Sequence, residues 1–170
     1  MAIDDFDWGR IETDLKRAAR RSLVRYPGLK PSATSLVHDV WLELARSDKW
    51  NAESEKHLKA LAVRVMHNNI LDAARRFYSQ KQGNGLVCEE IDPARHEAAE
   101  GSPEEILRVN EALEKLQQVE ERAAQVFEYS YFGGCTQQEI AESLGISETT
   151  VRADLKLAKA ILRRALRRGG

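Results

Sequence analysis

This sequence has few of the residues that interrupt helices and few of those that hold metals or disulfides. Among 170 residues it contains ten Gly, four Pro and two Cys. Cys88 and Cys135 lack the short spacing of a metal-binding or redox pair. The four histidines are scattered along the chain: His38, His57, His67 and His96. We therefore expect no metal, no disulfide and no cofactor.

Long apolar runs are also missing. No stretch approaches the roughly 18 apolar residues of a membrane span. The first ten residues, MAIDDFDWGR, are acidic and lack the apolar core of a signal peptide. No Gly-rich phosphate loop is visible, nor a nucleophile with a partnered base, so an enzyme is not expected. We expect a cytoplasmic protein without a membrane partner.

What the chain does contain favours an all-α fold. Ala, Leu, Arg, Glu and Lys dominate, and the apolar–polar alternation of strands is absent. Helical periodicity stops between Ser79 and Pro103, where Gly, Pro and acidic residues gather. We predict two small helical domains, residues 1–82 and 104–170, joined by a flexible acidic linker, residues 83–103. The C-terminal domain is predicted to hold a helix-turn-helix.

The net charge of −1 conceals a strong partition along the chain. Residues 1–82 carry a net charge of +4, residues 83–148 one of −11, and residues 149–170 one of +6. Two basic blocks around an acidic one indicate two separate surfaces that face a polyanion. For either block taken singly, a solvated structural charge pattern is the alternative.

The helix-turn-helix pattern lies between Thr136 and Arg168. Ile140 and Leu144 are expected to face inward, and Gly145 to take the left-handed conformation of a tight turn. Ser147 is the expected N-cap of the second helix. An ordinary helical hairpin is the alternative, but the basic C-terminus favours DNA. The candidate DNA contacts are Ser147, Glu148, Thr149, Thr150, Arg152, Ala153, Lys156 and Lys159.

Four helical segments are expected before the linker, in three stretches of sequence. The first covers about residues 8–26, the second begins after Pro31, with Ser32 or Thr34 as its cap, and runs to about Arg46. The third covers about residues 54–78, as one helix or two. In the second stretch Ser35, Asp39 and Glu43 recur every four residues on the polar face. Such a row is either a solvent-exposed face of the helix or a ridge that docks a partner.

The end of the third stretch mixes cations, amides and aromatic rings. Cations meet phosphates, rings stack on bases and amides bond to base edges, so this mixture suits single-stranded nucleic acid. A basic helix end favoured by the helix dipole is the alternative for Arg75 and Arg76 alone. The candidates are His67, Asn68, Asn69, Arg75, Arg76, Phe77 and Tyr78.

Three segments in this order resemble the extracytoplasmic-function (ECF) class of bacterial RNA polymerase sigma factors, which keep only sigma regions 2 and 4. The segments are SATSLVHDVWLEL, HLKALAVRVMHNNILDAARRF and TQQEIAESLGISETTVRADLKLAKAIL. The likeness covers residues 11–82 and 103–168. It implies an alternative sigma factor that binds core polymerase and starts transcription. A two-domain helix-turn-helix regulator that does not replace sigma is the alternative.

The resemblance implies a role for each candidate set. The helix that begins near Thr34 would dock on the β′ coiled coil of polymerase, while region 4 would meet the β flap. Residues 65–80 would recognise and open the −10 element, and the helix after Ser147 would read the −35 element. The implied contacts of core polymerase are Ser35, Leu36, Asp39, Val40 and Glu43.

The chain departs from the common family pattern at three positions. Ser35 stands where many members have an acid, His67 where they have Arg, and Asp154 where they have Arg. One interpretation is that the acid at position 154 orients Arg152 or a neighbouring cation. The hydroxyls beside the missing acid suggest control by a Ser/Thr kinase at Thr34 or Ser35, because a phosphate there restores negative charge at a helix N-terminus. An anti-sigma factor is a further partner to expect.

Overall fold

The computed structural model describes residues 6–46, 55–83 and 102–168. Within these ranges all regular structure is α-helical, which confirms the predicted fold class. The helices are α1 (Trp8–Leu23), α2 (Ala33–Arg46), α3 (Glu55–Gly83), α4 (Pro103–Val119), α5 (Glu121–Tyr131), α6 (Gln137–Leu144) and α7 (Glu148–Arg168). None of the described helices is both long and apolar enough to cross a membrane.

The first two helices begin at side-chain caps. The Asp7 carboxylate accepts a hydrogen bond from the Arg10 backbone N–H at 3.3 Å, and α1 ends at Leu23, a little earlier than predicted. The Ser32 hydroxyl accepts from the Ser35 backbone N–H at 3.1 Å, so Ser32 rather than Thr34 caps α2. Each cap satisfies an N–H group that has no partner inside its helix.

The third stretch forms the single long helix α3, which ends at Gly83 rather than near Tyr78. The first residues of the predicted interruption therefore continue the helix. The rest of the predicted linker, residues 84–101, lies outside the described residues. The Ser102 hydroxyl accepts a hydrogen bond from the Glu105 backbone N–H at 3.3 Å and caps α4.

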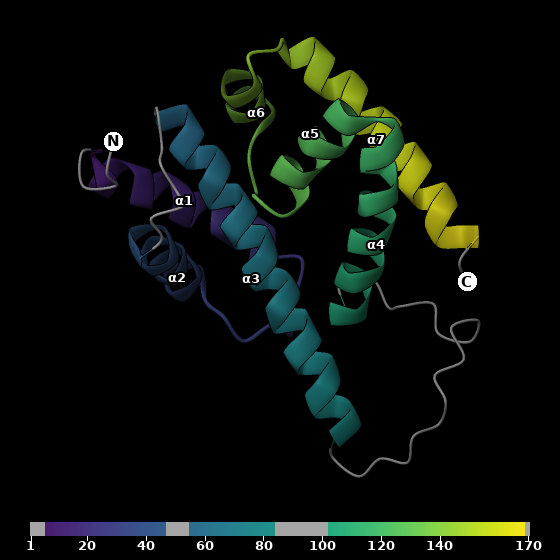
Figure 1. Ribbon diagram of the computed structural model, residues 1–170, viewed down its shortest axis with the longest axis horizontal. Coiled ribbons are helices and arrows are strands. Elements are labelled where there is room, and N and C mark those ends of the chain that lie inside the picture. Colours follow the sequence, from purple (N-terminus) through teal and green to yellow (C-terminus); the bar gives the residue numbers. More distant parts are fainter. Residues whose placement is uncertain (1–5, 47–54, 84–101, 169–170) are drawn as a thin grey trace.

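Helix α3 divides the molecule, with α1 and α2 on one side and α4 to α7 on the other (Figure 1). Helix α4 packs on α3, α5 and α7, while α5 forms an extensive contact with α7. Helix α7 lies at the outer edge and ends far from the N-terminal helix (Figure 1). We predicted two small cores. In the structure, helices of the two halves are in contact, for example α3 with α4.

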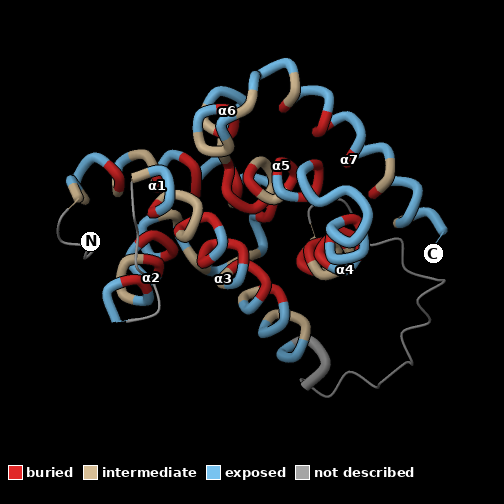
Figure 2. Tube along the Cα trace, turned by 45° about the horizontal axis from the view of Figure 1, so that its top comes forward, coloured by how far each residue is buried: buried red, intermediate tan, exposed pale blue. Residues whose placement is uncertain are grey.

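Buried residues turn inward along every helix (Figure 2). One continuous cluster reaches from α1 to α7 and includes Ile11, Leu36, Met66, Ile106, Phe132 and Leu162. A smaller cluster surrounds α6 and contains Val63, Val126, Ile140, Val151 and Leu155. Because Val63 belongs to α3, even the small cluster joins the two halves of the chain.

Candidate nucleic-acid interface

The turn between α6 and α7 is fixed by local chemistry. At the start of α6 the Thr136 hydroxyl accepts from the Glu139 N–H, and the Glu139 carboxylate accepts from the Thr136 N–H, both at 3.2 Å. Gly145 has a φ of 67°, which confirms the predicted left-handed turn. The Ser147 hydroxyl accepts from the Thr150 N–H at 3.1 Å, which confirms the predicted cap. These contacts set the direction in which α7 leaves α6.

One face of α7 is buried and the opposite face is open. Val151, Asp154, Leu155 and Ala158 are buried on the inner face, whereas Arg152, Ala153 and Lys156 between them are exposed. Of the eight residues predicted to contact the −35 element, Thr150 is half-buried and the others are exposed. We call the outward residues of α7 the reading face: Glu148, Thr149, Arg152, Ala153, Lys156 and Lys159. A cationic, open helix face after a tight turn is the geometry that a major groove accepts.

Asp154 does not belong to the reading face. Its side chain is buried and receives two hydrogen bonds from the Arg122 guanidinium of α5, from Nε at 2.7 Å and from Nη2 at 3.2 Å. Of the two cations that the sequence left open, Arg152 or a neighbour, the structure pairs Asp154 with a neighbour, Arg122 of another helix. The hydrogen bonds and the negative charge of Asp154 raise the pKa of Arg122.

The residues predicted to meet the −10 element lie on two sides of α3. Asn69, Arg76 and Phe77 line a groove of about 490 Å³ between α2 and α3, whereas His67, Asn68 and Arg75 line a groove of about 610 Å³ between α3 and the α4–α5 pair. Tyr78 is half-buried near the end of α3. A single face of α3 therefore does not present all seven candidates.

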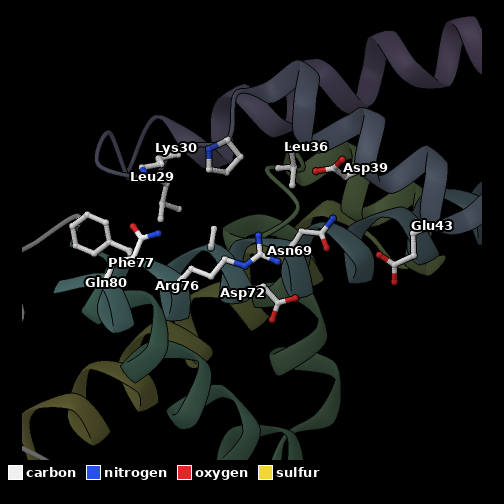
Figure 3. A pocket seen from close by; sticks show the side chains of 12 residues that line it. Leu29, Lys30, Leu36, Asp39, Glu43, Asn69, Asp72, Arg76, Phe77 and Gln80 are labelled. Atoms are coloured by element: carbon white, nitrogen blue, oxygen red, sulfur yellow. The ribbon is translucent and has the colours of Figure 1, made fainter. Parts of the chain in front are cut away.

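The α2–α3 groove is lined by residues of two predicted sets, the polymerase contacts of α2 and the −10 contacts of α3. Asp39 and Glu43 of α2 line it opposite Asn69 and Arg76 of α3 (Figure 3). Ser35, Asp39 and Glu43 are exposed, which agrees with a ridge on the outer side of α2. Leu36 and Val40, by contrast, are buried in the core and hold α2 in place, although Leu36 also lines the groove.

His67 is buried and bonded on both sides of its ring. Nδ1 lies 2.7 Å from Glu128 Oε1 of α5, and Nε2 lies 2.9 Å from Asn110 Oδ1 of α4. The ring also stacks on Phe132, with centroids 3.7 Å apart. In this arrangement His67 joins α3 to the C-terminal half of the molecule.

Sequence reasoning missed Arg122, Asn110 and Glu128. Each is a polar residue in a helical stretch rich in other polar residues, so no local pattern separates it from a solvated side chain. Among the described residues, no group of three or more His, Cys, Asp and Glu side chains is placed to hold a metal ion.

The fold and these surfaces define a class: an all-α protein that carries a capped, cationic helix after a tight turn and a separate helix lined with amides and cations. The ECF sigma factor family matches residues 5–168, nearly the whole chain. The chain therefore belongs to the ECF sigma factor family. Searches of curated proteins and of solved structures return no match. Family membership makes the protein an alternative sigma factor, which binds core RNA polymerase and promoter DNA to start transcription.

Proposed function

We propose that the three surfaces divide the work of a sigma factor: α2 docks polymerase, α3 binds the opened −10 strand and the reading face of α7 contacts the −35 element. In this scheme residues 104–168 contact the upstream −35 element, and residues 6–83 contact the downstream −10 element. The observation that carries the proposal is the sidedness of α7, whose inner face is packed while its outer face keeps Arg152, Lys156 and Lys159 exposed.

The polymerase-docking role of α2 rests on its acidic row. Asp39 and Glu43 are exposed on one side of the helix, and both line the α2–α3 groove (Figure 3). Buried Leu36 and Val40 fix the helix beneath them. A groove with carboxylates on its rim suits a partner helix that carries cations, such as the β′ coiled coil.

Binding of the −10 strand is the proposed work of α3. Its exposed Asn68, Arg75 and Arg76 supply amide and cationic groups, and half-buried Phe77 supplies a ring. Unstacking duplex DNA costs a few kcal/mol per step, and capture of the freed bases offsets that cost. No covalent step is assigned to the protein in this scheme, since polymerase makes the RNA.

The test uses purified core polymerase and a promoter mapped from transcript starts after overexpression. The wild-type chain should co-purify with polymerase and direct transcripts from that promoter. Asp39→Lys and Glu43→Lys should abolish co-purification, because each reverses a charge on the α2 ridge. Glu111→Lys is the matched control, since Glu111 is an exposed acid on α4 away from the ridge. Promoter-DNA binding without polymerase binding by the wild type would favour the regulator alternative.

Control of this activity is proposed to act on α2 as well. The first turn of α2 holds no acidic residue, and Thr34 and Ser35 are exposed there. A phosphate on either hydroxyl would place negative charge at the helix N-terminus. We expect the activity to be controlled by this phosphorylation or by an anti-sigma factor that covers the proposed surfaces. We also expect the protein to act in the cytoplasm, where polymerase is.

A further inference from the structure

The last two turns of α7 carry arginine as their only type of charged residue. Residues 160–168 contain four arginines, no lysine and no acid. All four are exposed, and together with Ala160 they line an open hollow of about 550 Å³. We call this cluster the arginine end: Arg163, Arg164, Arg167 and Arg168.

The core fixes the direction in which the arginine end points. Leu162 is buried in the cluster that reaches from α1 to α7, and Ile161 and Leu166 pack against that cluster. The arginines lie on the exposed side of the helix, which continues as far as its last turn (Figure 2). The guanidiniums are therefore attached to a helix that is held in place by packing.

The helix dipole explains only part of this cluster. Cations are favourable in the last turn of a helix, which accounts for Arg167 and Arg168. Arg163 and Arg164 lie one turn earlier, each four residues from another arginine, a spacing at which like charges repel. Within the described part of the chain, no carboxylate forms an ion pair with any of the four. A bound polyanion would relieve this repulsion.

The arginine end continues the line of cations on the reading face. The cations of this line follow one another at intervals of four, three, four and four residues: Arg152, Lys156, Lys159, Arg163 and Arg167. This spacing places them along one side of a helix, and all of them are exposed. A duplex that meets the reading face therefore extends toward the arginine end.

The line of cations is longer than a DNA groove is wide. At about 1.5 Å per residue, the reading face spans about 17 Å, and Arg163 lies about 22 Å along the helix from Glu148. The major groove of B-DNA is about 12 Å wide. A helix whose first turns enter the groove therefore carries the arginine end past the bases, toward phosphates outside the −35 element.

The side chains of the arginine end suit phosphates better than bases. The reading face mixes an acid, a hydroxyl, a methyl group and cations, which together can distinguish base edges. The arginine end offers only guanidinium donors, whose planar fork matches two phosphate oxygens. Phosphate contacts add affinity and carry no direct sequence information.

We propose that the arginine end is a second duplex-binding site, which holds phosphates of the DNA that flanks the −35 element. The inference rests on the function proposed above for the reading face, because that face sets where the duplex lies. The reading face selects the element, and the arginine end adds affinity that does not depend on sequence.

The test measures binding of two duplexes by the full-length chain. Both carry the −35 element of the mapped promoter and the same flanks, but in one of them neutral methylphosphonates replace the phosphates outside the element. On the fully charged duplex, Arg163→Ala and Arg167→Ala should each reduce the slope of log affinity against log salt by about 0.9. On the duplex with neutral flanks, both variants should match the wild type. Fluorescence anisotropy at several salt concentrations gives the slopes.

Three controls separate the arginine end from other effects. Arg46→Ala removes an exposed cation at the end of α2 and should bind both duplexes like the wild type. When the element is scrambled in the charged duplex, Arg163→Ala should lose affinity by the same factor, because a phosphate contact carries no sequence information. Arg163→Ala should also melt no lower than the wild type, because it removes a repulsion between like charges.

The inference is overturned if the wild type fails to bind the charged duplex at low salt, or if the variants bind it like the wild type. It is also overturned if the variants lose as much affinity on the duplex with neutral flanks. Failure of the reading face gives a different result. Arg152→Ala would then bind both duplexes like the wild type, while weaker binding of the charged duplex by Arg163→Ala would still support the arginine end.

Discussion

The guanidinium of Arg122 on α5 holds the buried carboxylate of Asp154 on α7 through two hydrogen bonds, at 2.7 and 3.2 Å. Asp154 lies on the buried side of the helix whose opposite side is the reading face. The pair therefore fixes the rotation of α7 about its own axis relative to α5. In the proposed mechanism this contact acts on DNA binding through the position of α7, since neither side chain belongs to the reading face.

We expect Arg122→Ala to weaken binding of the −35 duplex and to lower the midpoint of thermal unfolding. The substitution leaves the buried Asp154 carboxylate without its two donors, which is unfavourable in a site removed from water. Arg122→Lys should recover part of both losses, because an ammonium keeps the charge but not the fork of two N–H donors. Anisotropy with a promoter duplex and a thermal melt check the two effects.

Lys115→Ala is the matched control for Arg122→Ala, because it removes an exposed cation of α4 that pairs with Glu111 at the surface. It should change neither measurement. If Arg122→Ala lowers the melting midpoint but leaves duplex affinity intact, the pair stabilises the fold without positioning the reading face.

The reading face should bind DNA with a salt dependence set by its cations. We expect Arg152→Ala and Lys156→Ala each to reduce the slope of log affinity against log salt by about 0.9, provided the residue contacts a phosphate. Substitution of a residue that contacts a base edge should instead remove about 1–3 kcal/mol of discrimination between bases, at a single position of the site. Titrations of a −35 duplex at several salt concentrations separate these outcomes.

Arg46→Ala gives the comparison for the salt titrations, because Arg46 is an exposed cation at the end of α2. Its slope should equal that of the wild type. An unchanged slope and affinity in both α7 variants would remove the reading face from the proposed mechanism.

A buried residue of α6 should affect the same interface through folding. Ile140 is fully buried beneath the turn, in the small cluster with Val151 and Leu155. We expect Ile140→Ala to lower the free energy of unfolding by about 2–5 kcal/mol, the usual range for such a truncation. Ile140→Val should cost about 0.5–1.5 kcal/mol. Denaturant titrations measure both, and equal stability of the two variants would contradict the packing described here.

Local signals in the sequence were enough to predict the start of α7 and the turn before it. Gly145 acts through its own backbone conformation, and Ser147 acts through a hydrogen bond to an N–H three residues further along the chain. The periodicity of apolar residues likewise predicted the helices α1, α2 and α3. These features depend on neighbours along the chain, so a single sequence carries them.

Contacts between distant helices could not be predicted in the same way. The bond from Arg122 to Asp154 spans 32 positions and that from His67 to Glu128 spans 61. Nothing in the sequence around Glu128 distinguishes it from the exposed acids of the same helices. The division of the α3 candidates between two grooves also depends on where α2, α4 and α5 pack, which periodicity does not specify.

Phosphorylation of α2 should increase polymerase binding. Thr34 lies in the first turn of α2, so a phosphate there meets the positive end of the helix dipole. We expect Thr34→Glu and Ser35→Glu to raise co-purification with core polymerase, and a kinase-treated wild type to exceed them. Thr34→Ala and Ser35→Ala should prevent the kinase effect.

Ser32→Ala separates phosphorylation from capping. Ser32 Oγ caps α2 through the Ser35 N–H, so this variant destabilises the helix without removing either proposed phosphate site. It should lower thermal stability but keep the response to kinase. Equal polymerase binding by the alanine and glutamate variants, with and without kinase, would end the proposal of control at this turn.

Cys135 should remain a neutral, slowly reacting thiol in the folded protein. Burial, with the nearby Glu139 carboxylate, raises its pKa to about 12, above the ordinary value of about 8.5. In a Cys88→Ser variant at pH 8, iodoacetamide should therefore alkylate Cys135 slowly before unfolding and rapidly in urea. A native rate as fast as the rate in urea would contradict this burial.

The same raised pKa predicts how stability depends on pH. The folded state keeps the Cys135 proton at a pH where the unfolded state releases it, so the contribution of this proton to stability is complete below about pH 8.5. The contribution should fall as pH rises toward 12. Tyr129, whose pKa burial also raises to about 12, should add a loss that begins near pH 10. Urea titrations between pH 7 and 11 should show a smaller alkaline loss in Cys135→Ser than in the parent protein.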